Sequence, residues 1–78
     1  MTELTLNQLT PGQSLRVTRM ECGKELRRSL LSHGLTGGTY VRCLRLGPRG
    51  ASALYELRCS MLALRSSDGK RIFGELIP

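Results

Sequence analysis

Apolar and polar residues alternate along several short segments of this chain, a pattern typical of half-buried β-strands. Residues 14–20 show it clearly, because Leu15 and Val17 are separated by polar side chains. The other predicted strands cover residues 40–46, 53–59, 61–65 and 71–76. Five short strands separated by turn residues predict a small β-barrel.

The spacing changes to that of a helix over residues 24–33. Leu26, Leu30 and His33 stand at positions i, i+4 and i+7 and form one stripe. Gly34 follows, where a helix commonly ends in a left-handed residue. The opposite side of this helix is mostly basic or polar and carries Lys24, Arg27, Arg28 and Ser32.

Turn residues separate these elements. Pro11-Gly12 predicts a type II turn, because proline presets the first corner and glycine accepts the positive φ of the second. Gly37-Gly38 predicts another turn, residues 47–50 a loop, and residues 66–69 a tight turn or a single helical turn.

The alternation also predicts which side chains form the core. Met61 is interpreted as a core filler, because it occupies an alternating strand position and methionine adapts to irregular gaps. The other predicted core residues are Leu15, Val17, Leu30, Val41, Leu57, Leu62, Leu64 and Ile72.

The length of 78 residues predicts a single domain spanning residues 1–78. With no Trp and one Phe, the core should be small and aliphatic, so we expect no deep cofactor cavity and no cofactor. No apolar run is long enough for a membrane span, and the N-terminus does not resemble a signal peptide. We therefore expect a cytoplasmic protein.

The charge balance favours an acidic partner. Twelve Lys and Arg residues against six Asp and Glu residues give a formal net charge of +6. The arginines are spread along the chain, so a solvated basic surface and a functional patch both remain open interpretations.

Candidate chemistry is sparse. No nucleophile beside a base, pair of carboxylates or phosphate-binding loop is visible, so we predict no catalytic residues and no enzyme. The three cysteines are predicted to be free thiols, and their spacing matches no metal-binding motif. A metal bridging two molecules through His33, Cys22 or Cys59 stays open, whereas an intrinsic metal site is not predicted.

Five short motifs occur in an order and spacing that resemble one family. They are Leu6-x-x-Leu9-x-Pro11-Gly12, Leu26-Arg27-Arg28-x-Leu30-Leu31, Gly34-Leu35-x-x-Gly38, Pro48-x-Gly50 and Leu62-Ala63-Leu64-Arg65-x-x-Asp68. Together they resemble the FeoA family, the small cytosolic proteins that accompany the bacterial ferrous-iron transporter FeoB. The chain departs from the usual family residues at His33, Gly37, Arg49 and Ala51-Ser52.

The resemblance implies a mainly β fold, a small SH3-like β-barrel with one inserted α-helix. It also implies a non-enzymatic accessory protein that binds the cytoplasmic, G-domain region of FeoB and reaches the inner membrane only through that transporter. We expect no nucleic-acid partner, and a monomer or weak homodimer. The candidate partner contacts are Leu26, Arg27, Arg28, Leu31 and Arg49.

Two alternatives from other classes remain. A small basic RNA-binding SH3-like barrel would suit the charge, although its aromatic residues are few and dispersed. The domain also resembles the SH3-like C-terminal module of metal-dependent repressors, but no helix-turn-helix segment precedes it.

Overall fold

The computed structural model describes residues 3–78 and contains six strands, two α-helices and two short 3-10 turns. In chain order the elements are β1 (Glu3–Thr5), η1 (Leu6–Gln8), β2 (Ser14–Met20), α1 (Lys24–Ser32), β3 (Tyr40–Leu46), η2 (Pro48–Gly50), β4 (Ser52–Glu56), β5 (Met61–Arg65), α2 (Ser66–Gly69) and β6 (Ile72–Ile77).

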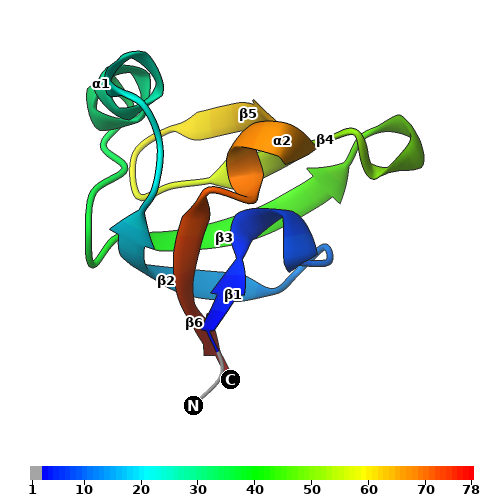
Figure 1. Cartoon of the computed structure of the whole chain (residues 1–78). Coiled ribbons are helices and arrows are strands. Elements are labelled where there is room, and N and C mark those ends of the chain that lie inside the picture. The colour runs from blue at the N-terminus through cyan, green and yellow to red at the C-terminus, as the bar shows by residue number, and fades with distance from the viewer. Residues whose placement is uncertain (1–2) are drawn as a thin grey trace.

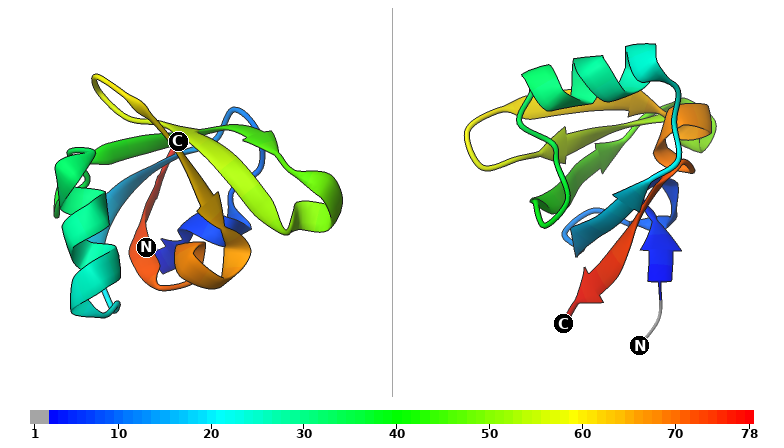
Figure 2. Two further views of the ribbon diagram at one scale, coloured as in Figure 1. Left: turned by 90° about the horizontal axis from the view of Figure 1, so that it is seen from above. Right: turned by 60° about the vertical axis from the view of Figure 1, so that its left-hand side comes forward.

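The strands form one antiparallel sheet in the order β1–β6–β2–β3–β4–β5. This sheet curls around the core, with α1 at one end and α2 beside η1 (Figures 1 and 2). It does not close, because β1 and β5 remain its two edges. The result is the small SH3-like, barrel-like fold with one inserted helix that the sequence predicts.

Three predicted strands, 14–20, 40–46 and 61–65, have the predicted bounds. The prediction for residues 53–59 was wrong at its end, because β4 stops at Glu56. There the chain turns into a hairpin, and the Leu57 N–H donates to the Ser60 carbonyl oxygen at 2.8 Å. Strand β1 was not predicted, and β6 starts and ends one residue later than the predicted 71–76.

The glycine turns follow the sequence prediction. Gly12 has φ 94°, and the Gln13 N–H donates to the Thr10 carbonyl oxygen at 3.0 Å, as a type II turn requires. Gly34 has φ 86° immediately after His33, the residue that ends α1. These turns fix the direction in which the chain enters β2 and leaves α1.

All eight residues predicted for the core besides Met61 are buried. Met61 is 61% exposed, so its assignment to the core was wrong. The reason is the phase of β5, in which Leu62 and Leu64 point inward and Met61 points outward with Ala63. The remaining buried hydrophobic residues are Leu6, Leu9, Leu35, Cys43, Ala53 and Tyr55.

Within residues 3–78, no helix combines the length and the hydropathy needed to cross a membrane.

Candidate partner-binding surface

Helix α1 is held at one end of the barrel by its inner face. Leu30 is fully buried, and Leu26 is partly buried against the same core. The guanidinium of Arg27 donates a 3.0 Å hydrogen bond to the carbonyl oxygen of Met20, the last residue of β2. This bond fixes the first turn of the helix against the strand that leads into it.

The outer face of α1 combines an apolar side chain with charges. Leu31 is 48% exposed, and Arg27 and Arg28 are exposed as well. Leu26 and Leu31 were the two predicted apolar contacts on this helix. Leu26 packs mostly against the core, whereas Leu31 is accessible to a partner. We call Arg27, Arg28 and Leu31 the α1 face.

Three of the four ion pairs among residues 3–78 involve an arginine of β2. Arg19 contacts Glu3 at 3.0 Å and Glu21 at 2.5 Å, and its guanidinium lies 3.9 Å from the centroid of the Phe73 ring. The hydrogen bond from Arg19 lowers the pKa of the Glu3 carboxyl. Helix α1 itself carries three basic residues, Lys24, Arg27 and Arg28, and one acidic residue, Glu25, so its net formal charge is positive.

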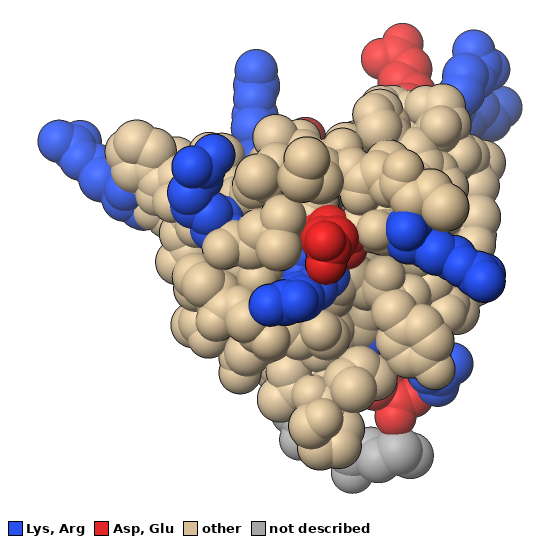
Figure 3. Space-filling model, turned by 180° about the vertical axis from the view of Figure 1, so that it is seen from behind, with Lys and Arg blue, Asp and Glu red and all other residues tan. Residues whose placement is uncertain are grey.

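Two further pairs, Arg16–Glu75 at 3.0 Å and Arg42–Glu56 at 4.0 Å, complete the ion pairs among residues 3–78. With Arg16, Arg19 and Arg42 paired, nine of the twelve basic residues lie outside these pairs. The space-filling view shows basic side chains distributed over one side of the molecule, without a single dense patch (Figure 3).

Arg49 is not brought to the α1 face. It lies in η2 with φ 59°, the only non-glycine residue among those described with a positive φ, and its side chain is exposed. In the ribbon views, η2 and α1 occupy opposite ends of the molecule (Figures 1 and 2). The predicted contacts therefore form two separate surfaces.

Three side chains were predicted as possible ligands of a metal that bridges two molecules, and only His33 and Cys59 lie in neighbouring segments. The Ser60 hydroxyl donates to the His33 carbonyl oxygen at 3.1 Å, which places the exposed Cys59 in a loop attached to the end of α1. Cys22 precedes the other end of that helix. Within the described residues, no three His, Cys, Asp or Glu side chains gather as a metal site, and bridging between molecules stays a prediction.

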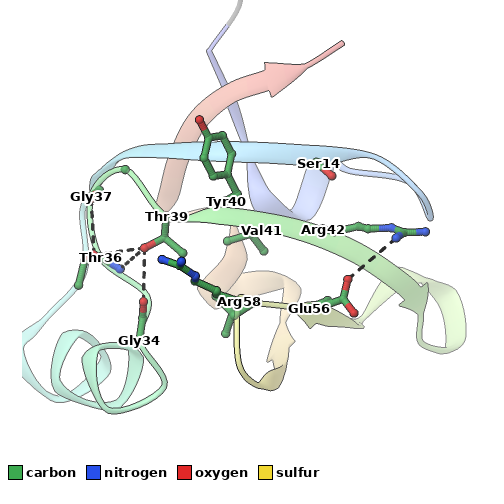
Figure 4. Close-up of a pocket in the computed structure, with 12 residues that line it drawn as sticks. Ser14, Gly34, Thr36, Gly37, Thr39, Tyr40, Val41, Arg42, Glu56 and Arg58 are labelled. Atoms are coloured by element: carbon green, nitrogen blue, oxygen red, sulfur yellow. Dashed lines mark hydrogen bonds and ion pairs between the residues drawn. The ribbon is translucent and has the colours of Figure 1, made fainter.

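Sequence reasoning missed an open groove of about 960 Å³ beside β3. Its walls are the glycine turn after α1, the first residues of β3, and the chain where β4 ends (Figure 4). Arg58 points into it from the loop after β4. The predicted turn at Gly37-Gly38 was the one part of this groove that the sequence indicated. The rest could not be predicted from local patterns, because the groove joins segments about 20 residues apart in the chain.

Comparison with known proteins agrees with the fold. The family model described as FeoA domain matches residues 4–76. A Campylobacter jejuni protein that carries the name Fe(2+) transport protein A is 32% identical over 74 residues, covering 95% of this chain and all of that protein.

Solved structures show the same similarity. The NMR structure of a FeoA-like protein from Clostridium acetobutylicum has a TM-score of 0.85 and 26% identity, covering all of this chain and 92% of that one. A manganese-dependent transcriptional repressor has a TM-score of 0.86 at 16% identity, covering 96% of this chain and 42% of the repressor. At that identity the repressor shares the fold alone.

Proposed function

This chain belongs to the FeoA family, and from that premise we propose that it serves ferrous-iron transport as a non-enzymatic accessory protein. Its proposed partner is the cytoplasmic region of a FeoB-type transporter. It would act in the cytoplasm, as a monomer or weak homodimer, and meet the membrane only through that partner.

The observation that carries the proposal is the α1 face. Leu31 leaves about half of its surface in water although it adjoins a fully buried residue, Leu30. Protein interfaces typically have an apolar centre within a polar rim, and the contacts around the centre exclude water from it. Leu31 is therefore the proposed anchor.

Arg27 and Arg28, the two arginines of the α1 face, differ in whether the guanidinium already has a hydrogen-bond partner within the chain. The guanidinium of Arg27 is already bonded to the Met20 carbonyl oxygen, whereas Arg28 has no hydrogen bond or ion pair to residues 3–78. Arg28 can therefore reorient toward a carboxylate and bind it with two parallel N–H donors. Such pairs at the rim mainly accelerate association and set orientation.

Arg49 is proposed as a second, separate contact. Because η2 lies at the far end of the barrel from α1, one compact partner surface cannot reach both residues without also covering the barrel between them. Arg49→Ala should therefore weaken association independently of changes on the α1 face, with additive free energies.

The proposal is tested by co-purification of the full chain with the intact, detergent-solubilised transporter, in the presence and absence of GTP. Retention by the transporter, competed by an excess of its isolated cytoplasmic region, is the expected result. Retention that this region does not compete would place the contact elsewhere, and the absence of retention in both nucleotide states would reject the proposed partner.

A further inference from the structure

The groove beside β3 contains a short free strand edge. Strand β4 pairs with β3 from Leu46↔Ala53 to Arg42↔Glu56 and then ends, whereas β3 begins two residues earlier, at Tyr40. The first residues of β3 therefore have β2 on one side and no strand on the other. That open side belongs to the groove of Figure 4.

The backbone of Tyr40 faces this open side. The N–H of Cys43 donates to the Gln13 carbonyl oxygen, and the carbonyl oxygen of Cys43 accepts from the Gly12 N–H. The backbone groups of Cys43 therefore face the β2 side. Thr39 likewise accepts from the Val17 N–H at 2.9 Å. Backbone groups alternate between the two sides of a strand, so those of Tyr40 point away from β2. No backbone partner for its N–H or carbonyl oxygen occurs within residues 3–78.

A second feature of the groove, the side chain of Arg58, favours a negatively charged ligand. Arg58 would stand opposite Tyr40 if β4 continued, but it lies in the hairpin loop and extends toward the turn at Thr36 and Thr39. No carboxylate among the described residues pairs with it, whereas Arg42 in the same groove has Glu56. The guanidinium is thus available for an incoming carboxylate.

We propose that this groove binds an extended peptide segment with an acidic side chain. One residue of the segment would exchange a pair of backbone hydrogen bonds with Tyr40, extending the sheet as β-augmentation does. A Glu or Asp side chain would then pair with Arg58, and the Tyr40 ring, 62% exposed, would cover neighbouring apolar side chains.

Three observations favour a peptide as the occupant. The free groups at Tyr40 are a strand's donor and acceptor, which an extended backbone matches. The net charge of +6 and the carboxylate-free Arg58 favour an acidic segment. A volume of about 960 Å³ is large enough for several residues, since drug-sized sites are about 300–1,000 Å³. This inference does not depend on the transporter proposal.

The test is an NMR titration of the full ¹⁵N-labelled chain. The probe is the peptide acetyl-Val-Thr-Val-Glu-Val-Thr-amide, and its control carries Gln in place of Glu. We expect saturable shifts at the Tyr40, Thr36 and Arg58 amides, with slower hydrogen exchange at the Tyr40 amide. The Glu peptide should bind about five- to tenfold more tightly than the Gln peptide, because one charge-assisted contact is lost.

Two variants assign the charge effect. In Arg58→Gln, both peptides should bind equally weakly. Arg65→Gln removes the same charge from an exposed residue outside the groove and should preserve the difference. Unchanged spectra outside the groove confirm that each variant is folded.

The proposal is overturned if neither peptide shifts these amides at millimolar concentration, if the shifts lie elsewhere, or if the wild type binds both peptides equally. It is also overturned if an oligouridine RNA, and neither peptide, perturbs the groove. None of these outcomes bears on co-purification with the transporter, so the two proposals fail separately.

Discussion

The phenol of Tyr55 donates a buried 3.1 Å hydrogen bond to the backbone carbonyl oxygen of Leu6. This bond joins β4 to η1 across 49 positions of sequence and lies beneath the end of the barrel that α2 covers. Burial raises the pKa of Tyr55 to about 12, with a smaller contribution from the neighbouring Cys43. The fold therefore holds this phenol in its neutral, donating form.

Tyr55 should make the protein sensitive to alkaline pH. In the unfolded chain a tyrosine titrates near pH 10, so between about pH 10 and 12 the unfolded state loses its proton first and stability falls as pH rises. The loss should reach about 1–3 kcal/mol by pH 12. Urea unfolding across this range measures it.

Tyr55→Phe should flatten that alkaline slope and cost about 1–2 kcal/mol at neutral pH, because the Leu6 carbonyl oxygen loses one of its two donors and keeps only the Leu9 N–H. Tyr40→Phe is the matched control, since the Tyr40 side chain is exposed and its hydroxyl has no hydrogen bond within residues 3–78. An equal slope in wild type and Tyr55→Phe would show that another group controls alkaline unfolding.

Leu64→Ala should cost about 2–5 kcal/mol, because Leu64 is buried and its truncation leaves a cavity. Met61→Ala, on the outer face of the same strand, should change stability by no more than about 0.5 kcal/mol. Chemical denaturation of both variants checks the phase of β5. Similar costs for the two substitutions would contradict it.

Gly74 is predicted to tolerate no side chain. A Cβ built there would lie 2.3 Å from the Arg16 carbonyl oxygen and 2.7 Å from a methyl carbon of Leu15, where β6 passes the bulge of β2. Gly74→Ala should therefore destabilise the protein by about 1–3 kcal/mol. Gly37→Ala, where a Cβ meets open space, is the control for thermal unfolding. A Gly74→Ala variant as stable as wild type would exclude this close approach.

The three thiols should react in the order of their exposure. Cys59 is exposed, Cys22 intermediate and Cys43 buried, and burial raises the pKa of the Cys43 thiol. Titration with an aromatic disulfide reagent under native conditions should modify Cys59 first and Cys43 only on unfolding. Rapid native modification of Cys43 would contradict its place in the core.

Local chemistry explains which parts of the fold the sequence predicts. Val17 and Val41 follow strict alternation, and Gly12 and Gly34 occupy positive-φ positions that few other residues adopt, so these elements are readable from neighbouring residues. Strand β1 is different. It has only three residues, and its pairing of Glu3 with Glu75 spans nearly the whole chain.

The surfaces are harder to predict for the same reason. Whether Leu26 or Leu31 is accessible depends on how α1 settles on the core, and periodicity alone places both near one stripe. The groove at Tyr40 depends on β4 ending at Glu56, although the apolar pattern continues to Leu57. Such features arise from nonlocal packing, which a one-dimensional pattern does not encode.

Binding kinetics on the immobilised cytoplasmic region of a FeoB-type transporter test the central claim most directly. Leu31→Ala should raise the dissociation rate and cost about 2 kcal/mol or more, because it removes the proposed anchor. Arg27→Ala with Arg28→Ala should mainly slow association and reduce its dependence on salt. Leu76→Ala, which truncates a leucine 39% exposed in β6, a strand that carries neither proposed contact, is the matched control.

The account predicts that Leu31→Ala and the double arginine variant each change these rates in their own way, while Leu76→Ala binds like the wild type. Binding that is unaffected by Leu31→Ala and by the double arginine variant would contradict the α1 face as the contact. Undetectable transporter binding, with an RNA oligomer bound at a steep salt dependence that weakens on loss of Arg27 and Arg28, would contradict the assigned partner itself.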